Sequence, residues 1–256
     1  MSRHRPRKRF GQHFLTDPGV VDAIISAIAP SHDDVIVEIG PGLGAITRLL
    51  AARAGALHAI ELDRDLAARL VREFATNSSV TVHEADALNF DYAGLGPSLR
   101  IVGNLPYNVS TPLLFQLLRY SAHIVDMHFM LQKEVVDRMA AAPGSKAYGR
   151  LGIMLGCHFQ IDALFDVDKS AFDPPPKVTS AVVRLAPLPA GTYVIEDEAR
   201  LSRLVAQAFS QRRKTIRNSL RNVADEALLE SVGIDPGLRP EAIAIADYVR
   251  LANTLE

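Results

Sequence analysis

The chain lacks most of the features that mark secreted, membrane-embedded and metal-binding proteins. It has one cysteine, Cys157, and so cannot form an internal disulfide. No apolar run is long enough to span a bilayer, and no apolar segment of a secretory signal follows the basic start of the chain. The 8 histidines are scattered without ligand spacing. We therefore expect a cytoplasmic protein with no bound metal and no membrane partner. Cys157 is expected to be a small buried side chain in a packed helix and not a catalytic thiol.

The net charge of −1 hides a separation of charge along the chain. Residues 1–14 carry five basic residues and no acid, and residues 212–221 carry five more and no acid. Two compact basic patches on an otherwise acidic body predict contact with a polyanion, although a basic terminal arm could also be only a solubilising tail. The candidate contacts are Arg7, Lys8, Arg9, Arg212, Arg213, Lys214, Arg217 and Arg221.

Short apolar runs alternate with helical patterns between about residue 20 and residue 185. Strands are predicted over 35–39, 56–60, 80–82, 100–103, 127–131, 159–165 and 180–185, and helices over 45–53, 66–74, 112–120 and from 133. This alternation indicates an α/β fold with a mostly parallel sheet that helices cover on both faces.

Beyond the turn at 187–191 only helical patterns follow, over 197–221, 224–232 and 242–255. The sequence thus divides into a basic arm (1–14), an α/β domain (15–186) and a small helical domain (187–256). The second basic patch falls on the first of these helices and is expected to have no acidic partners, which suits phosphate contacts. The apolar stripe beside it consists of Val205, Phe209, Ile216 and Leu220.

A glycine-rich turn, Glu38-Ile-Gly-Pro-Gly-Leu-Gly44, joins the first predicted strand to the following helix. Glycines such as Gly40 and Gly42 let the backbone approach a ligand closely. Dinucleotide-binding enzymes use the same device, but Pro41 lacks the amide that could bind a phosphate. The turn therefore favours a nucleoside-like ligand without a pyrophosphate, such as S-adenosylmethionine.

Acidic residues end the next two predicted strands. Glu61 can accept hydrogen bonds from both ribose hydroxyls of such a ligand, and Asp86 can accept one from its adenine amino group. Each acid alone could be a solvated residue at a strand end. Open α/β sheets, however, bind ligands at the carboxyl ends of successive strands, so the joint placement predicts a cofactor site.

The fourth predicted strand ends in Asn104-Leu105-Pro106-Tyr107. Asn-x-Pro is common in simple turns, but the same residues also suit methylation of adenine N6, whose lone pair is delocalised into the ring. The side-chain oxygen of Asn104 and the carbonyl of Leu105 could accept the two amino hydrogens. Pro106 would fix the turn, and Tyr107 would stack on the flipped base. No general base is needed, because the methylated nitrogen loses its proton readily to water, and the reaction is then mainly one of positioning.

Together these segments resemble the ribosomal RNA adenine N6,N6-dimethyltransferases over nearly the whole chain, and most of all the bacterial small-subunit members linked to kasugamycin resistance. The matching motifs are Arg9–Leu15, Glu38–Gly44, Glu61–Asp63, Gly103–Tyr107, Phe129–Glu134, Ala171–Lys177 and Gln211–Arg217. The resemblance implies a Rossmann-like, seven-stranded methyltransferase sheet with one late antiparallel strand and a small all-helical C-terminal domain.

The resemblance also implies particular site residues. Cofactor contacts are implied at His13, Leu15, Gly40, Glu61, Asp86 and Asn104. Phe172 is placed opposite Tyr107, so that the two rings sandwich the target adenine. Many members of the family have asparagine where this chain has His13, whose ring can still offer an N–H or a nitrogen lone pair, or whose backbone could make the contact instead.

The implied activity is N6,N6-dimethylation of two adjacent adenosines near the 3′ end of 16S rRNA, within the 30S subunit or its precursor. The enzyme would be a monomer, would convert S-adenosylmethionine to S-adenosylhomocysteine, and would have a role in small-subunit biogenesis. The basic patches would then bind RNA.

Three alternatives stay open. Large-subunit rRNA methyltransferases share the same loop, although the basic segment Gln211–Arg217 and the Phe172 loop favour the small-subunit type. A non-enzymatic assembly or transcription factor could keep the fold, but the intact Asn104 and the cofactor acids argue against pure binding. A nicotinamide-dependent dehydrogenase could share the glycine-rich turn.

Overall fold

The computed structural model describes residues 13–106, 109–211 and 213–255. They form two compact units, each made of two separate stretches of sequence. One comprises residues up to Val136 together with Asp162–Pro187, and the other comprises Asp137–Ile161 together with the residues from Leu188 onward. The predicted boundary after residue 186 lies within one residue of the third crossing between the units, at 187–188. The first two crossings, at 136–137 and 161–162, were not anticipated from the sequence.

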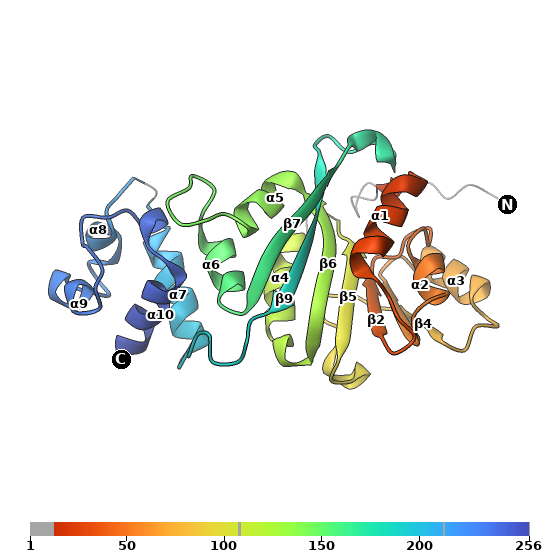
Figure 1. The fold of residues 1–256 in the computed structure, drawn as a ribbon, viewed down its shortest axis with the longest axis horizontal. Helices are drawn as coiled ribbons and strands as arrows, with labels where there is room; N and C mark the ends of the chain where they lie inside the picture. The colour runs from red at the N-terminus through yellow and green to blue at the C-terminus, as the bar shows by residue number, and fades with distance from the viewer. Residues whose placement is uncertain (1–12, 107–108, 212, 256) are drawn as a thin grey trace. The chain divides into compact units, whose positions relative to one another are not determined.

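A seven-stranded sheet lies in the first unit except for the first residues of its edge strand β7 (Figure 1). Its strands, in spatial order, are β4 (Val80–Glu84), β3 (Ala56–Glu61), β2 (Val35–Ile39), β5 (Leu99–Asn104), β6 (Ile124–Gln132), β9 (Ser180–Pro187) and β7 (Phe159–Val167). The pairs from β4 to β6 are parallel, and β9 runs antiparallel to β6. The predicted strands, the mostly parallel sheet and the late antiparallel strand are confirmed.

The strand order brings the predicted motifs to one edge of the sheet. β2 lies between β3 and β5. The chain therefore passes from β2 to β3 on one side and later returns to β5 on the other side. This change of direction makes the carboxyl end of β2 the switch point, where such sheets bind ligands. The register pairs Ile39 with Ile60 on one side and with Gly103 on the other. The three carboxyl ends are therefore level with one another.

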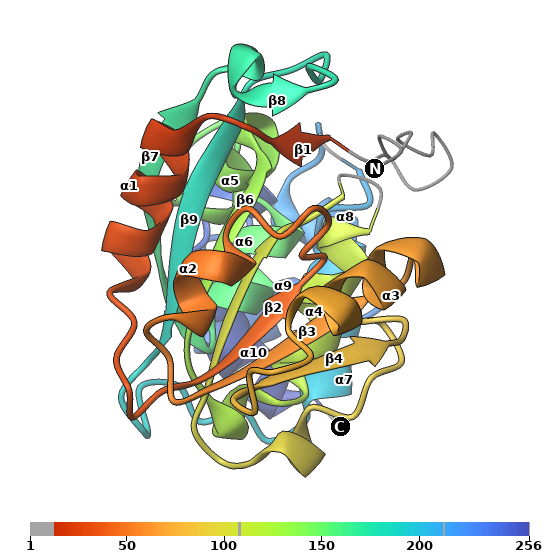
Figure 2. The same ribbon diagram turned by 90° about the vertical axis from the view of Figure 1, so that its right-hand side faces the viewer.

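Helices cover the sheet on both faces. They are α1 (Pro18–Ile28), α2 (Thr47–Ala51), α3 (Arg64–Glu73), α4 (Ser110–Leu118) and α5 (Lys133–Met139). Figures 1 and 2 show α1 on one face and α4 on the other. Helix α1 was not predicted, although its start is well marked: Asp17 accepts a hydrogen bond from the Val20 amide and Pro18 occupies the first turn. The buried side chains of α1 pack on the sheet in the same core as Ile36 and Val102.

Two very short strands were also missed. β1 (Phe14–Leu15) pairs antiparallel with β8 (Phe172–Asp173), with Leu15 opposite Phe172. The hydroxyl of Thr16 extends the contact by donating to the Ala171 carbonyl. Two of the family motifs, far apart in sequence, are thereby joined.

The helices of the second unit lie in both of its stretches of sequence. Its helices are α6 (Arg150–Gly156), α7 (Glu198–Ala208), α8 (Ile216–Leu220), α9 (Glu226–Ser231) and α10 (Ile245–Thr254). Cys157 follows α6 and is 5% exposed. The burial expected for Cys157 is confirmed, and this burial raises the pKa of its thiol to about 12.

The single helix expected over 197–221 is wrong. α7 ends at Ala208, and the amide and the hydroxyl of Ser210 both donate to the Gln207 carbonyl, which tightens the last turn. The chain restarts as α8 after Thr215. The predicted apolar stripe is therefore divided between two helices.

In the part of the chain that the structure describes, no helix is long and apolar enough to cross a membrane.

Candidate cofactor and catalytic site

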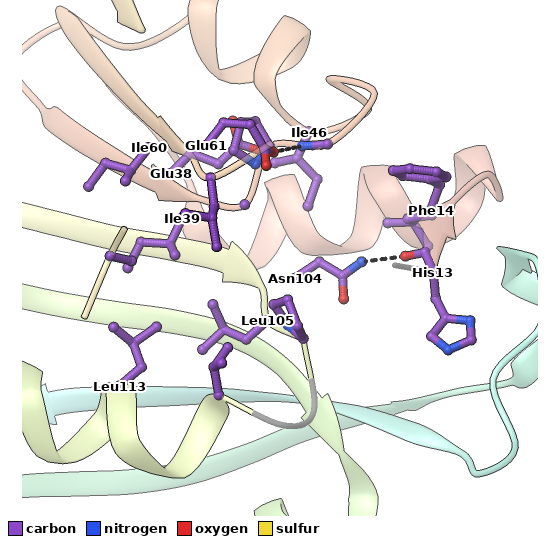
Figure 3. Close-up of a pocket in the computed structure, with 18 of the residues that line it drawn as sticks. His13, Phe14, Glu38, Ile39, Ile46, Ile60, Glu61, Asn104, Leu105 and Leu113 are labelled. Atoms are coloured by element: carbon purple, nitrogen blue, oxygen red, sulfur yellow. Dashed lines mark hydrogen bonds between the residues drawn. The ribbon is translucent and has the colours of Figure 1, made fainter. Parts of the chain in front are cut away.

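A pocket opens at the carboxyl ends of the central strands, within the first unit (Figure 3). Most of the residues that were predicted to bind the cofactor or the target base line this pocket. These are His13, Leu15, Gly40, Gly42, Glu61, Asp86, Asn104, Leu105, Pro106 and Phe172. Tyr107 lies outside the described residues, as do Arg7, Lys8, Arg9 and Arg212.

The glycine-rich turn forms one wall of the pocket. Gly40 and Gly42 have left-handed backbones, with φ of 69° and 59°, which glycine adopts without strain. A Cβ at Gly42 would lie 3.2 Å from the ring of Phe14. The turn therefore needs glycine here both for its backbone and for the close approach of β1. Phe14 was present in a motif but was not recognised as a pocket residue.

The three glycine amides of this turn are already engaged within the protein. Gly40 donates to the Ile60 carbonyl at 2.9 Å, and Gly44 donates to the Pro41 carbonyl at 2.9 Å. Gly42 donates to Glu61 Oε2 at 3.0 Å. These amides are thus unlike those of phosphate-binding turns, which point at the ligand.

Glu61 is fixed at the end of β3 and is 6% exposed. Its Oε1 accepts a hydrogen bond from the Asp63 amide at 2.8 Å, while its Oε2 accepts from Gly42. Burial raises the pKa of the carboxyl, although the backbone hydrogen bonds oppose this shift. Each oxygen keeps a lone pair, so the carboxylate can still accept two hydroxyl donors.

Asp86 follows β4 and is half-buried. Its Oδ1 accepts from the Leu88 amide at 3.0 Å, and its Oδ2 accepts from Asn89 Nδ2 at 2.9 Å. Both bonds fix the carboxylate at the pocket, where each oxygen can accept one further donor.

Asn104 is oriented by the start of the described chain. Its Nδ2 donates to the His13 carbonyl at 3.2 Å, and Figure 3 shows its oxygen turned away from that contact. The His13 ring donates through Nδ1 to the Pro174 carbonyl at 2.7 Å. His13 therefore orients Asn104 through its backbone, while its ring binds the loop after β8.

The other loop residues differ in exposure. Leu105 is 1% exposed, and its amide donates to the Met130 carbonyl. Pro106 accepts from the Val109 amide at 3.1 Å, which closes the turn into α4. Phe172 is 4% exposed and packs in the core with Leu15, yet it also lines the pocket.

The second basic patch lies on the surface of the second unit. Arg213, Lys214, Arg217 and Arg221 are all exposed. Arg217 forms an ion pair with Glu226 at 3.0 Å, so the expectation that the patch has no acidic partners is wrong for this residue. The pair joins α8 to α9, nine positions along the chain, and sequence spacing on one helix could not reveal it.

Within the described residues no group of three or more potential metal ligands occurs.

The sheet order, the antiparallel strand β9 and the carboxylate-lined pocket at the switch point define a Rossmann-like methyltransferase. The model of one family, described as "Ribosomal RNA adenine dimethylase", matches residues 3–256, and the chain belongs to this family. It is accordingly an rRNA adenine dimethyltransferase that uses S-adenosylmethionine and has rRNA as its substrate.

Curated relatives and solved structures agree with this assignment. The chain is 57% identical to "Ribosomal RNA small subunit methyltransferase A" of Aromatoleum aromaticum, over 99% of this chain and 95% of the relative. It is 55% identical to the protein of the same name from Chromobacterium violaceum, over 100% and 97%. A dimethyladenosine transferase from Plasmodium falciparum matches with a TM-score of 0.82 and 25% identity, over 93% and 96% of the two chains. The 23S rRNA methyltransferase ErmE matches with a TM-score of 0.75 and 26% identity, over 94% and 99%.

Proposed function

We propose that the enzyme dimethylates N6 of two adjacent adenosines near the 3′ end of 16S rRNA, in the 30S subunit or its precursor, as a monomer with a role in small-subunit biogenesis. The names of the two bacterial relatives support the choice of subunit. The observation that carries the chemistry is the Asn104 amide, whose nitrogen is held by His13 and whose oxygen is left for a substrate donor.

The pocket residues fit S-adenosylmethionine. Glu61 would accept both ribose hydroxyls, and Asp86 would accept from the adenine amino group. Gly40 and Gly42 would let the methionine part approach the backbone, and Leu15 and Asn104 would close the site. When bound, S-adenosylmethionine supplies an electrophilic methyl group and becomes S-adenosylhomocysteine; none of these residues calls for a metal.

Asn104 and Leu105 would activate the target nitrogen. The Asn104 oxygen and the Leu105 carbonyl accept the two N6 hydrogens, which draws the nitrogen towards a tetrahedral geometry and frees its lone pair. The new N–C bond forms as the S–C bond breaks in line with it. The N6 proton then leaves to water, so no residue of the site has to act as a base.

The flipped adenine would lie between Tyr107 and Phe172, with Pro106 fixing the turn that carries Tyr107. Phe172 is held by the pairing of β8 with β1. The same pairing stabilises the His13 carbonyl contact, so one short ladder supports both the aromatic contact and the orientation of Asn104.

The basic residues would bind the phosphates of the RNA, which fixes its register without reading sequence. In the second unit this role falls to Arg213, Lys214, Arg217 and Arg221, beside Arg212, and at the start of the chain to Arg7, Lys8 and Arg9. The Arg217–Glu226 ion pair would have to open or share its guanidinium when RNA binds.

Mass spectrometry of rRNA tests the activity directly. In a deletion strain, N6,N6-dimethyladenosine should disappear from 16S rRNA, and a plasmid with the wild-type gene should restore it. The Asn104→Ala gene should not restore it although the protein accumulates. Full dimethylation in the deletion strain would refute the proposal, and restoration by Asn104→Ala would point to a role without catalysis.

Methylation of the large subunit is the second candidate, because the ErmE structure matches along nearly the whole chain. Purified enzyme with labelled S-adenosylmethionine can be offered 30S particles, naked 16S rRNA and 23S rRNA in parallel. We expect label in the small-subunit RNA, and preferential label in 23S rRNA would favour the alternative.

A further inference from the structure

The ring of His13 makes a contact that the proposed chemistry leaves without a role. The carbonyl of this residue accepts a hydrogen bond from Asn104 Nδ2 at 3.2 Å, while its ring meets the Pro174 carbonyl at 2.7 Å. Figure 3 shows the ring turned away from the Asn104 contact. One residue therefore joins the catalytic amide to the loop after β8, which lies 161 positions further along the chain.

The ring contact continues a ladder at the point where the backbone cannot. β1 and β8 pair Phe14 with Asp173, so the next pair along is His13 with Pro174. Proline has no N–H and cannot donate to a ladder. The Pro174 carbonyl can only accept, so Nδ1 of the imidazole is the donor. The His13 side chain therefore supplies the hydrogen bond where the backbone pairing ends.

The other end of β8 is held by different donors. The Ala171 carbonyl accepts from the Thr16 amide at 2.8 Å, from the Asp17 amide at 3.3 Å and from the Thr16 hydroxyl at 3.2 Å. Phe172 follows directly, is 4% exposed and lines the pocket. The segment that carries this aromatic ring is thus held before the ring by three donors and after it by His13.

We propose that the His13 side chain is a positioning residue for methyl transfer, which fixes Phe172 relative to the Asn104 oxygen. It acts through its hydrogen bond to the Pro174 carbonyl. This inference rests on the proposed function, in which Phe172 stacks on the target adenine and Asn104 accepts an N6 hydrogen. Because the ring and the carbonyl belong to one residue, the wall that holds the base and the amide that activates it keep a fixed separation.

The separation matters because the target nitrogen must lie in line with the S–C bond that breaks. A misplacement of about 1 Å can cost about 10²-fold in rate, even when the altered residue does not touch the reacting atoms. Loss of the His13 ring contact should therefore slow the transfer step. It should leave the binding of S-adenosylmethionine largely intact, because the His13 carbonyl and the β1–β8 pairing remain.

The proposed role requires a donor at one place and does not require an imidazole. The amide nitrogen of asparagine is bonded to Cγ, as Nδ1 is in histidine, so His13→Asn can donate to the same carbonyl. His13→Leu has nearly the same shape as His13→Asn but neither a donor nor a charge. The two variants therefore separate the hydrogen bond from the volume of the side chain.

Single-turnover methylation of 30S particles with labelled S-adenosylmethionine measures the transfer step. His13→Leu should lower its rate by about 10-fold to 10²-fold, and His13→Asn should recover most of this loss. Titration calorimetry with S-adenosylmethionine should show a much smaller change for both variants. If the wild-type enzyme does not label 30S particles, the proposed function fails instead, whatever the variants do.

Thr16→Val is the matched control, because it removes a side-chain donor at the other end of β8 while two amides still hold the Ala171 carbonyl. It should cost much less in rate than His13→Leu. Equal losses for these two variants would mean that the general stability of the ladder sets the rate, which would overturn the proposal. Equal rates for His13→Leu and His13→Asn, or a loss confined to cofactor binding, would overturn it as well.

A double-mutant cycle with Phe172→Leu tests whether His13 acts through the aromatic ring. Residues of one network have non-additive effects, so His13→Leu should lower the rate far less in the Phe172→Leu background than in the wild type. Independent, additive losses would contradict the inference. If His13→Leu does not fold, His13→Ala replaces it in both experiments, because it removes the same donor and adds no bulk.

Discussion

Replacing Glu38 by glutamine should stabilise the ligand-free enzyme at alkaline pH. The raised pKa means that the folded state holds the proton of Glu38 more tightly than the unfolded chain does. The stability that this proton contributes is fully present below pH 4.5, the ordinary value for the group, and is lost as the pH rises through about 7. Glutamine has nearly the same shape but no charge at any pH, so the variant avoids the loss.

The expected size follows from the shift. A change in pKa from 4.5 to about 7 corresponds, at roughly 1.4 kcal/mol per pH unit, to about 3 kcal/mol. Glu38 is buried, so screening by solvent does not reduce this figure as it does for surface groups. For a chain of this size, a free-energy difference of about 3 kcal/mol corresponds to a difference of about 6–12 °C in melting temperature between the variant and the wild type.

Thermal unfolding of the ligand-free proteins between pH 4.5 and pH 8 measures the effect. The difference in melting temperature between Glu38→Gln and the wild type should grow steadily over this range, in favour of the variant. Glu84→Gln should run parallel to the wild type. Parallel profiles for Glu38→Gln and the wild type would show that Glu38 is already ionised or well solvated in the folded state, and the reasoning would fail.

Three further predictions concern the turn, the loop and the RNA contacts. Asn104→Ala should lower kcat by about 10²-fold or more and should cost less in cofactor affinity by calorimetry; a loss confined to binding would contradict the catalytic role. Gly42→Ala should destabilise the protein by about 1–2 kcal/mol and weaken cofactor binding, because the left-handed backbone and the aromatic ring of β1 both oppose a Cβ. Gly191→Ala, where φ is also positive but nothing lies within 4 Å, isolates the backbone part in the same unfolding assay. Arg217→Ala should flatten the salt dependence of RNA binding by about one unit, whereas Glu226→Gln should strengthen binding by releasing the paired guanidinium; an unchanged slope would remove Arg217 from the interface.

The parts of the site that the sequence predicted are those set by strand order. Gly40 directly follows β2, while Glu61 and Asn104 end β3 and β5, and parallel strands place their carboxyl ends at one edge. Once the sheet was expected, the proximity of these residues followed without any knowledge of side-chain packing. Their apolar strands are long enough for the periodicity to be visible in one sequence.

The contacts that were missed depend on long-range packing. β1 and β8 have two residues each, too few for a periodic pattern, and their pairing joins Leu15 to Phe172 across most of the α/β domain. The chain restarts as α8 where the Ile216 amide donates to the Leu238 carbonyl and Gln207 Nε2 donates to the Ser219 carbonyl, in a segment whose spacing still suits one helix. These tertiary contacts override a local pattern.

The hydrogen bonds of the glycine-rich turn are stronger evidence for a phosphate-free cofactor, and against a dinucleotide, than the presence of Pro41 in the sequence. All three glycine amides of the turn at 40–44 donate to acceptors within the protein. A pyrophosphate binds to free amides of such a turn and gains from nearby positive charge. Here it would meet Glu38, Glu61 and Asp86 instead, with no lysine or arginine among the described lining residues. The same carboxylates favour a cationic sulfonium, because opposite charges attract strongly where water is excluded. The sequence of this turn alone would allow a dehydrogenase. Its hydrogen bonds and the negative charge around it, however, disfavour the dinucleotide that a dehydrogenase needs.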